Sequence, residues 1–114
     1  MGFIKNQQKG VTIIKIEDER LDSRIAPQLK SELLFLASEG TKNVLIDLSD
    51  VSYADSSGLG AFLFGIRQMK NIGGELKLFA ANDRIMSLVR IARLSGILLN
   101  YHKKEEAISS FEEE

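Results

Sequence analysis

The sequence predicts one α/β domain that spans residues 1–114 and contains a mixed β-sheet layered with about four helices. Apolar, β-branched runs typical of strands alternate along the chain with segments whose apolar residues recur at helical spacing. Strands that are joined through helices are usually parallel, with right-handed crossovers. A hairpin at the start of the chain adds an antiparallel pair, so the expected sheet is mixed.

The start of the chain is typical of a β-hairpin. Residues 3–6 are compatible with a short edge strand, Gly10 marks a turn, and Val11–Ile16 is rich in β-branched residues. The charged residues 17–22 then lead away from the sheet.

A first helix is expected from about Ser23 to about Ser38. Ser23 is a candidate N-cap, and Pro27 is acceptable only in the first turn of a helix. Gly40 is a natural residue for the C-terminal end. Four apolar residues recur at helical spacing and are expected to face the core: Ala26, Leu29, Leu33 and Leu36.

The middle of the chain predicts a central strand and a second helix. Residues 44–48 are apolar except for Asp47, as expected for a strand that helices cover. The helix is expected over residues 59–72, with Gly73 and Gly74 ending it. Its predicted core face consists of five apolar residues: Leu59, Phe62, Leu63, Ile66 and Met69.

The next segment predicts a strand at residues 76–79 and a third helix that Asn82 caps and Gly96 ends. Four residues at helical spacing form the expected core face of this helix: Ile85, Leu88, Val89 and Ala92.

The end of the chain predicts two short elements. Residues 97–101 are expected to form an edge strand, and residues 105–111 a final helix whose Ile108 and Phe111 pack back on the domain. The acidic residues 112–114 are expected to fray.

Composition excludes several classes of function. The chain has 114 residues, 44% of them hydrophobic, which indicates a globular domain with one modest core. Lys and Arg total 15 and Asp and Glu total 16, so the charge does not favour nucleic acid or an anionic membrane. The absence of cysteine excludes disulfides and thiol catalysis. Residues 1–10 are unlike a signal peptide and no apolar run could span a bilayer, so a soluble cytoplasmic protein is the simplest interpretation.

Residues 51–60, the serine segment, read V-S-Y-A-D-S-S-G-L-G and place Ser56 and Ser57 where a strand leads into a helix. The first N–H groups of a helix lack intrahelical partners and the dipole makes that end partly positive, so an added phosphate is tolerated there. Gly58 and Gly60 are expected to leave the helix start open to a docking surface. An ordinary cap explains the same residues, with Asp55 or a serine accepting a hydrogen bond from the first turn.

The string D-S-S-G-L-G after an apolar strand resembles the switch motif of the STAS domain, the family of bacterial anti-sigma factor antagonists. The resemblance runs from about Gly10 to about Tyr101 and includes L-D at residues 21–22, I-G-G-E-L at 72–76 and L-S-G-I at 94–97. It implies that Ser56, the first hydroxyl after the aspartate, is the phosphoacceptor. The surface expected to bind the partner comprises Asp22, Asp55, Ser57, Gly58, Leu59, Gly60 and Phe64.

The chain departs from the family pattern at two places. Glu19 and Arg20 stand where a Gly-Glu pair usually precedes the L-D, so a differently shaped loop is expected. Phe64 stands where family members often have a small residue. A helical wheel puts Phe64 with Gly60 and Gln68 on the solvent side, where Phe64 is either an anchor for a partner or a tolerated surface aromatic.

The resemblance implies a regulator without catalytic activity or cofactor that works by partner switching. The unphosphorylated form would bind an anti-sigma factor, itself an ATP-dependent serine kinase, and so release the sigma factor. Phosphorylation of Ser56 would break the complex, with Asp22 and Asp55 repelling the new charge, and a PP2C-type phosphatase would restore it. Two alternatives are a STAS subunit of a larger signalling scaffold and the small cytoplasmic partner of a lipid or anion transporter.

Other chemistry has weaker support in the sequence. Gly58 and Gly60 begin a G-x-G-x-x-G pattern, but Leu63 breaks it and no P-loop lysine follows. His102 is the only histidine and is expected at the surface, so zinc sites and histidine-based triads lack their residues. Four carboxylates could gather near the serine segment around Mg²⁺ or stay separate as solvated or capping groups, a choice that the sequence leaves open: Asp22, Asp47, Asp50 and Asp55.

Overall fold

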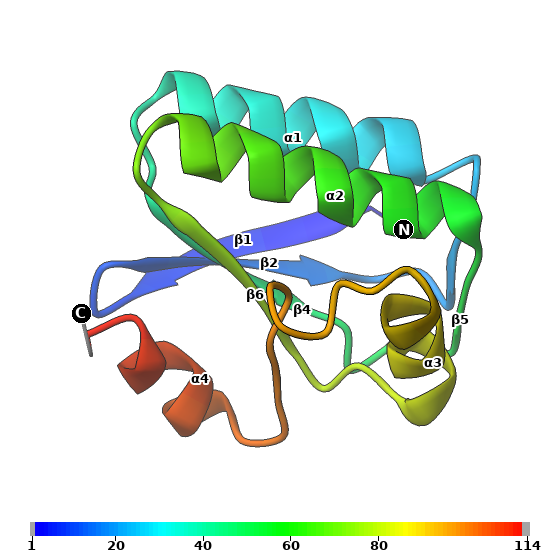
Figure 1. Ribbon diagram of the computed structural model, residues 1–114. Helices are drawn as coiled ribbons and strands as arrows, with labels where there is room; N and C mark the ends of the chain where they lie inside the picture. Colours follow the sequence, from blue (N-terminus) through cyan, green and yellow to red (C-terminus); the bar gives the residue numbers. More distant parts are fainter. Residues whose placement is uncertain (1, 113–114) are drawn as a thin grey trace.

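A computed structural model describes residues 2–112, and these residues form a five-stranded sheet with four helices (Figure 1). The sheet has the order β1-β2-β4-β6-β7, and a separate two-stranded sheet pairs β3 with β5. The strands are β1 Phe3–Gln8, β2 Val11–Ile16, β3 Arg20–Leu21, β4 Asn43–Asp47, β5 Tyr53–Ala54, β6 Glu75–Phe79 and β7 Asn100–Tyr101. The helices are α1 Ala26–Ser38, α2 Ser56–Asn71, α3 Asp83–Ile91 and α4 Lys104–Ser110. The expected α/β class, with a mixed sheet and about four helices, is confirmed.

The hairpin between β1 and β2 supplies the antiparallel pair, in the register Phe3↔Ile16 to Gln8↔Val11. Lys9 and Gly10 both have positive φ, 51° and 80°, as a two-residue hairpin turn of type I′ requires. Because this tight turn carries the pairing up to Gln8, β1 is longer than the expected strand at residues 3–6.

The remaining strand pairs of the large sheet are parallel. β4 lies between β2 and β6, as expected of the most apolar strand. The edge strand expected at residues 97–101 shrinks to Asn100–Tyr101. The backbone N–H groups of Ile97 and Leu98 both donate to the Leu94 carbonyl in a turn, so this part of the chain cannot join the ladder.

Helices cover both faces of the sheet (Figure 1). α1 and α2 lie side by side over one face, and α3 adds Ile85 and Val89 to the same core. α4 covers the opposite face, where Ile108 and Phe111 pack against Val11, Ile13 and Leu45, as expected for the final helix. Of residues 112–114, which were expected to fray, 113 and 114 lie outside the described residues.

A buried lysine fastens α4 to the sheet. Lys77 of β6 is only 7% exposed, and its Nζ donates to the carbonyl and the hydroxyl of Ser110, at 3.2 and 2.9 Å. The same ammonium group lies 4.5 Å from the centre of the Phe111 ring. These contacts compensate the burial of its charge.

The first helix packs as predicted but begins differently. All four expected core residues of α1 are buried, Pro27 lies in the first turn, and Gly40, with φ of 80°, follows the end of the helix. Ser23 is not the cap: the N-cap residue is Ile25, with no side-chain hydrogen bond. The Asp22 carbonyl instead accepts from the N–H groups of Ile25 and Ala26, so a backbone turn starts the helix.

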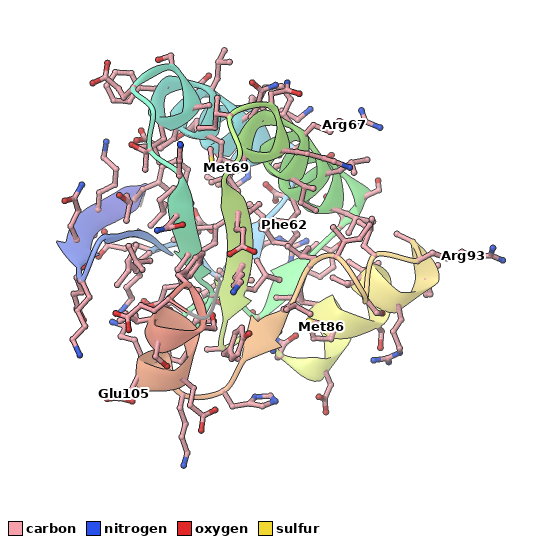
Figure 2. The ribbon with its side chains drawn as sticks, turned by 60° about the vertical axis from the view of Figure 1, so that its left-hand side comes forward. Phe62, Arg67, Met69, Met86, Arg93 and Glu105 are labelled. Atoms are coloured by element: carbon pink, nitrogen blue, oxygen red, sulfur yellow. The ribbon has the colours of Figure 1, made fainter. Side chains whose placement is uncertain are left out.

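The second helix is rotated from the predicted core face. Phe62 and Met69 are buried, and they point towards the sheet while Arg67 points away (Figure 2). Leu59, Leu63 and Ile66, predicted as core, are only half-buried. Small residues complete the buried stripe instead, namely Gly58, Ala61 and Gly65. The cause is close packing: a Cβ on Gly65 would lie 2.7 Å from Leu33 of α1.

The third helix is capped by Asn82, as predicted, whose Oδ1 accepts from the N–H of Ile85 at 2.9 Å. Ile85 and Val89 are buried, and Leu88 packs half-buried against the core. The prediction for Ala92 is wrong: the helix ends at Ile91, and Ala92 is its exposed C-cap.

Candidate functional site: the start of helix α2

The short pairing of β3 with β5 brings two distant loops together beside the serine segment. The register is Arg20↔Tyr53 and Leu21↔Ala54. The Glu19 carbonyl accepts from the N–H groups of Ser52 and Tyr53, at 2.9 and 3.1 Å. The loop that holds Asp22 therefore lies next to the start of α2.

Asp55 is the N-cap of α2. Its backbone is extended, and its Oδ1 accepts from the N–H groups of Ser57 and Gly58, at 2.9 and 3.4 Å. Of the capping alternatives, the structure therefore has the aspartate and not a serine. This cap also occupies two N–H groups of the first turn that the sequence had left free for a phosphate.

Ser56 is the first residue of α2, so the helix begins three residues earlier than predicted. The effective cap at Asp55 explains the early start. Ser56 is exposed, and its hydroxyl forms no hydrogen bond with any residue between 2 and 112. Ser57 is half-buried. Of the two serines, Ser56 is therefore the more accessible to another protein.

The two glycines of the motif have different environments. Gly58 is buried, and a Cβ there would lie 2.7 Å from the Leu21 carbonyl oxygen and 2.9 Å from Leu21 Cγ. Gly60 has no such neighbour within 4 Å. The expectation of an open surface therefore holds at Gly60 and is wrong at Gly58, where the missing side chain lets α2 approach β3.

Asp22 lies in the neighbouring loop among basic groups. Its carboxylate accepts from the backbone N–H of Arg24 at 3.1 Å and lies 3.3 Å from Arg24 Nε and 3.6 Å from Arg20 Nε. Burial raises the pKa of Asp22, but the hydrogen bond from the Arg24 backbone, the charge of Arg24 and the side-chain donors of Arg24 and Arg20 outweigh it and hold that pKa below its ordinary value. The negative charge of Asp22 is therefore largely balanced within its own loop.

Two surface grooves meet at Ser56. One, of about 310 Å³, lies between the starts of α1 and α2 and is lined by Ser23, Pro27, Lys30, Ser56, Ser57 and Gly60, among others. The other, of about 550 Å³, lies between the serine segment and α3 and is lined by Tyr53, Ser56, Arg84, Ser87, Leu88 and Ile91, among others. The second groove is the more apolar, and its Ile91 is 79% exposed. A phosphate on Ser56 would stand on the rim that the two grooves share.

Arg20, which the sequence marked only as a departure from the family pattern, contacts the ring of Tyr53. Its guanidinium lies 4.1 Å from the centre of the Tyr53 ring, and the guanidinium of Arg84 lies 5.9 Å from the same centre. These contacts join the β3 loop, the serine segment and α3. Nothing in the local pattern identified Arg84, since its neighbours are distant in the sequence.

Phe64 is not the exposed aromatic that the wheel predicted. It is half-buried and lies about one turn beyond Gly60 along α2. Leu59, also expected at the partner surface, is half-buried and packs against the main core. Because both side chains are half-buried, only part of either is left for a partner.

Of the two alternatives left open for the four carboxylates, the structure has the separate groups, since residues 2–112 contain no group of three or more potential metal ligands. Asp47 is buried, accepts from the Ser49 N–H at 2.9 Å and lies 4.0 Å from Lys104 Nζ. Asp50 lies 3.6 Å from Lys15 Nζ.

His102 is exposed, as predicted. Within residues 2–112, no helix has the length and apolar character that crossing a membrane requires.

Comparisons with known proteins show which family the chain resembles. Residues 3–107 match the model of the STAS domain. An anti-sigma-B factor antagonist from Bacillus subtilis is 40% identical over 78 residues, which cover 68% of this chain and 71% of that protein.

Two solved structures share the fold. An anti-sigma factor antagonist domain protein from Planctomyces limnophilus superposes with a TM-score of 0.87 at 21% identity, over 98% of this chain and 99% of that one. The phosphorylated form of the Bacillus cell fate determinant SpoIIAA has a TM-score of 0.76 at 19% identity, over 96% and 98%. At these identities the structures show the fold alone. Anti-sigma factor antagonists are regulators and not enzymes. Together, the match to the family model and the curated relative show that the chain belongs to the STAS domain family of anti-sigma factor antagonists.

Proposed function

We propose that the protein acts by partner switching. In the unphosphorylated form it binds an anti-sigma factor that is also a serine kinase, and this binding releases the sigma factor. Transfer of the γ-phosphoryl group of ATP to the Ser56 hydroxyl oxygen, with release of ADP, breaks the complex. A PP2C-type phosphatase hydrolyses the phosphoserine and restores the binding form. The proposal places the cycle in the cytoplasm.

The observation that carries the proposal is the position of the Ser56 hydroxyl. It is exposed, lies on the first residue of α2 and forms no hydrogen bond within residues 2–112. A kinase can therefore reach it without unfolding the helix. Ser57 is half-buried, so it is the less accessible acceptor.

The mechanism of the block follows from where the phosphate would stand. A phosphoserine brings nearly two negative charges at neutral pH and three strong acceptor oxygens. On the rim shared by two grooves, this group would have to be desolvated before a partner could dock. Repulsion by Asp22 contributes less than the sequence suggested, because Arg20 and Arg24 balance its charge. The proposed block is thus local, and the fold does not need to change.

The test begins with the partner. Tagged protein is used to capture its partner from a lysate of the source organism, and the captured kinase is incubated with the protein and Mg-ATP before the site is mapped by mass spectrometry. We expect phosphate on Ser56. Ser56→Ala should bind the kinase constitutively and Ser56→Asp should bind poorly, while the matched control Ser57→Ala should still be phosphorylated. Phosphate on Ser57 alone would refute the assignment, and capture of a large scaffold or a transporter subunit without a kinase would favour the alternatives.

A further inference from the structure

One arginine beside Ser56 has a charge that no described residue balances. Arg20 is paired with Asp22, and Arg24 with Asp22 and Asp18. Arg84 is exposed, lies in the first turn of α3 and forms no ion pair or side-chain hydrogen bond within residues 2–112. It nevertheless lines the same groove as the Ser56 side chain.

Tyr53 holds this arginine at the groove. The β3–β5 pairing fixes the Tyr53 backbone, and the centre of the Tyr53 ring lies 5.9 Å from the Arg84 guanidinium. Cation–π contacts of this kind favour one orientation of an arginine without using its N–H donors. The fork of donors therefore stays available for a bidentate contact with phosphate oxygens, which is the geometry that arginine suits best.

The carboxylates and the helix end around Ser56 are already engaged. The Asp55 Oδ1 accepts from the first turn of α2, and Asp22 is balanced by two arginines. Because the Asp55 cap takes the N–H groups of Ser57 and Gly58, the helix end offers a phosphate fewer donors than a bare helix start would. Lys30 of α1, across the smaller groove, is the competing cation.

We propose that, once Ser56 is phosphorylated, Arg84 binds the phosphoryl group and draws it into the groove between the serine segment and α3, with Tyr53 as the platform for the arginine. This inference rests on the proposed phosphorylation of Ser56. It specifies which groove phosphorylation closes to a partner, because the bound phosphate covers the groove that Leu88 and Ile91 line. It also makes Arg84 a positioning residue for the phosphorylated state, in addition to its contact with the Tyr53 ring in the unphosphorylated fold.

The test needs no kinase, because phosphoserine can be installed at position 56 during translation. The phosphorus NMR signal of the full chain is followed through the second phosphate ionisation, which is centred near pH 6. A guanidinium about 4–5 Å from the phosphate in water lowers the midpoint of this ionisation by roughly half a pH unit. We expect Arg84→Ala to raise the midpoint by that amount and Arg84→Lys to raise it less.

Two control variants make the result decisive. Arg90→Ala removes the same charge from the same helix, but Arg90 donates to Ser87 and lies outside the lining of this groove, so its midpoint should match the wild type. Lys30→Ala should also leave the midpoint unchanged. Equal midpoints for wild type and Arg84→Ala, or a shift in Lys30→Ala instead, would overturn the proposal. Either result would leave the phosphorylation of Ser56 untouched, since kinase mapping tests that separately.

Discussion

Two glycines of the serine segment, two residues apart on α2, provide a matched test of how tightly this helix packs on β3. Alanine at position 58 places a Cβ 2.7 Å from the Leu21 carbonyl oxygen and 2.9 Å from Leu21 Cγ, whereas alanine at position 60 meets nothing within 4 Å. The Leu21 carbonyl also accepts from the Asp55 N–H at 3.4 Å, so moving it disturbs the start of the helix.

The magnitudes follow from these distances. Overpacking of this kind costs about 1–3 kcal/mol, and replacing a helical glycine by alanine recovers ~0.5–1 kcal/mol. Because the nearest atom at position 58 belongs to paired backbone and not to a flexible side chain, we expect Gly58→Ala to lose about 1–2 kcal/mol of unfolding free energy. Gly60→Ala should gain up to ~1 kcal/mol. For a chain of 114 residues, each kcal/mol corresponds to roughly 3–6 °C in Tm.

Urea unfolding followed by circular dichroism measures both free energies, and a thermal melt checks their sign. The difference between the variants matters more than either value, because both replace glycine by alanine in the first half of one helix. Equal stabilities for the two variants would refute the packing of α2 against β3 described above. A stabilising Gly58→Ala would do so more directly.

Further predictions concern the cap and the half-buried aromatic. Asp55→Ala removes the acceptor of two N–H groups and should cost about 1 kcal/mol in urea unfolding, with Asp55→Asn close to wild type; an unchanged alanine variant would contradict the cap. Phe64→Ala should cost about 1 kcal/mol, roughly half the value of a fully buried side chain, and should also weaken partner binding in calorimetric titration. Partner affinity equal to wild type would remove Phe64 from the proposed surface.

Local signals in the sequence predicted much of the fold. The β-branched run of β2, the apolar run of β4 and the caps at Asp55 and Asn82 each depend on neighbouring residues, and all four occur in the structure. The position of Ser56 at the start of a helix was predicted in the same way. The local pattern also favoured an open helix start, but which of the two serines is the more exposed depends on how α1, α2 and α3 pack.

The errors in α2 have a common physical cause, which is packing between distant segments. The periodicity of α2 predicted Leu63 as core, but Gly58 and Gly65 let the helix approach Leu21 and Leu33 with a different face. The same rotation turned Phe64 from an exposed residue into a half-buried one.

Arg84 could not be identified from local patterns, because Tyr53, whose ring it contacts, and Ser56, which lines the same groove, come from another segment. The sequence marked Arg20 only as an unusual residue before the L-D. Its contact with Tyr53 could not be predicted without the β3–β5 pairing, which brings the two residues together. Contacts of this kind depend on tertiary structure, which periodicity and capping do not specify.

The central claim is that a phosphate on Ser56 switches partner binding without changing the fold. Isothermal titration of the captured anti-sigma factor kinase with unmodified protein and with protein carrying phosphoserine at position 56 tests it most directly, with circular dichroism on both forms. We predict at least a tenfold loss of affinity on phosphorylation, which corresponds to about 1.4 kcal/mol, with unchanged spectra. Equal affinities for the two forms would contradict the claim.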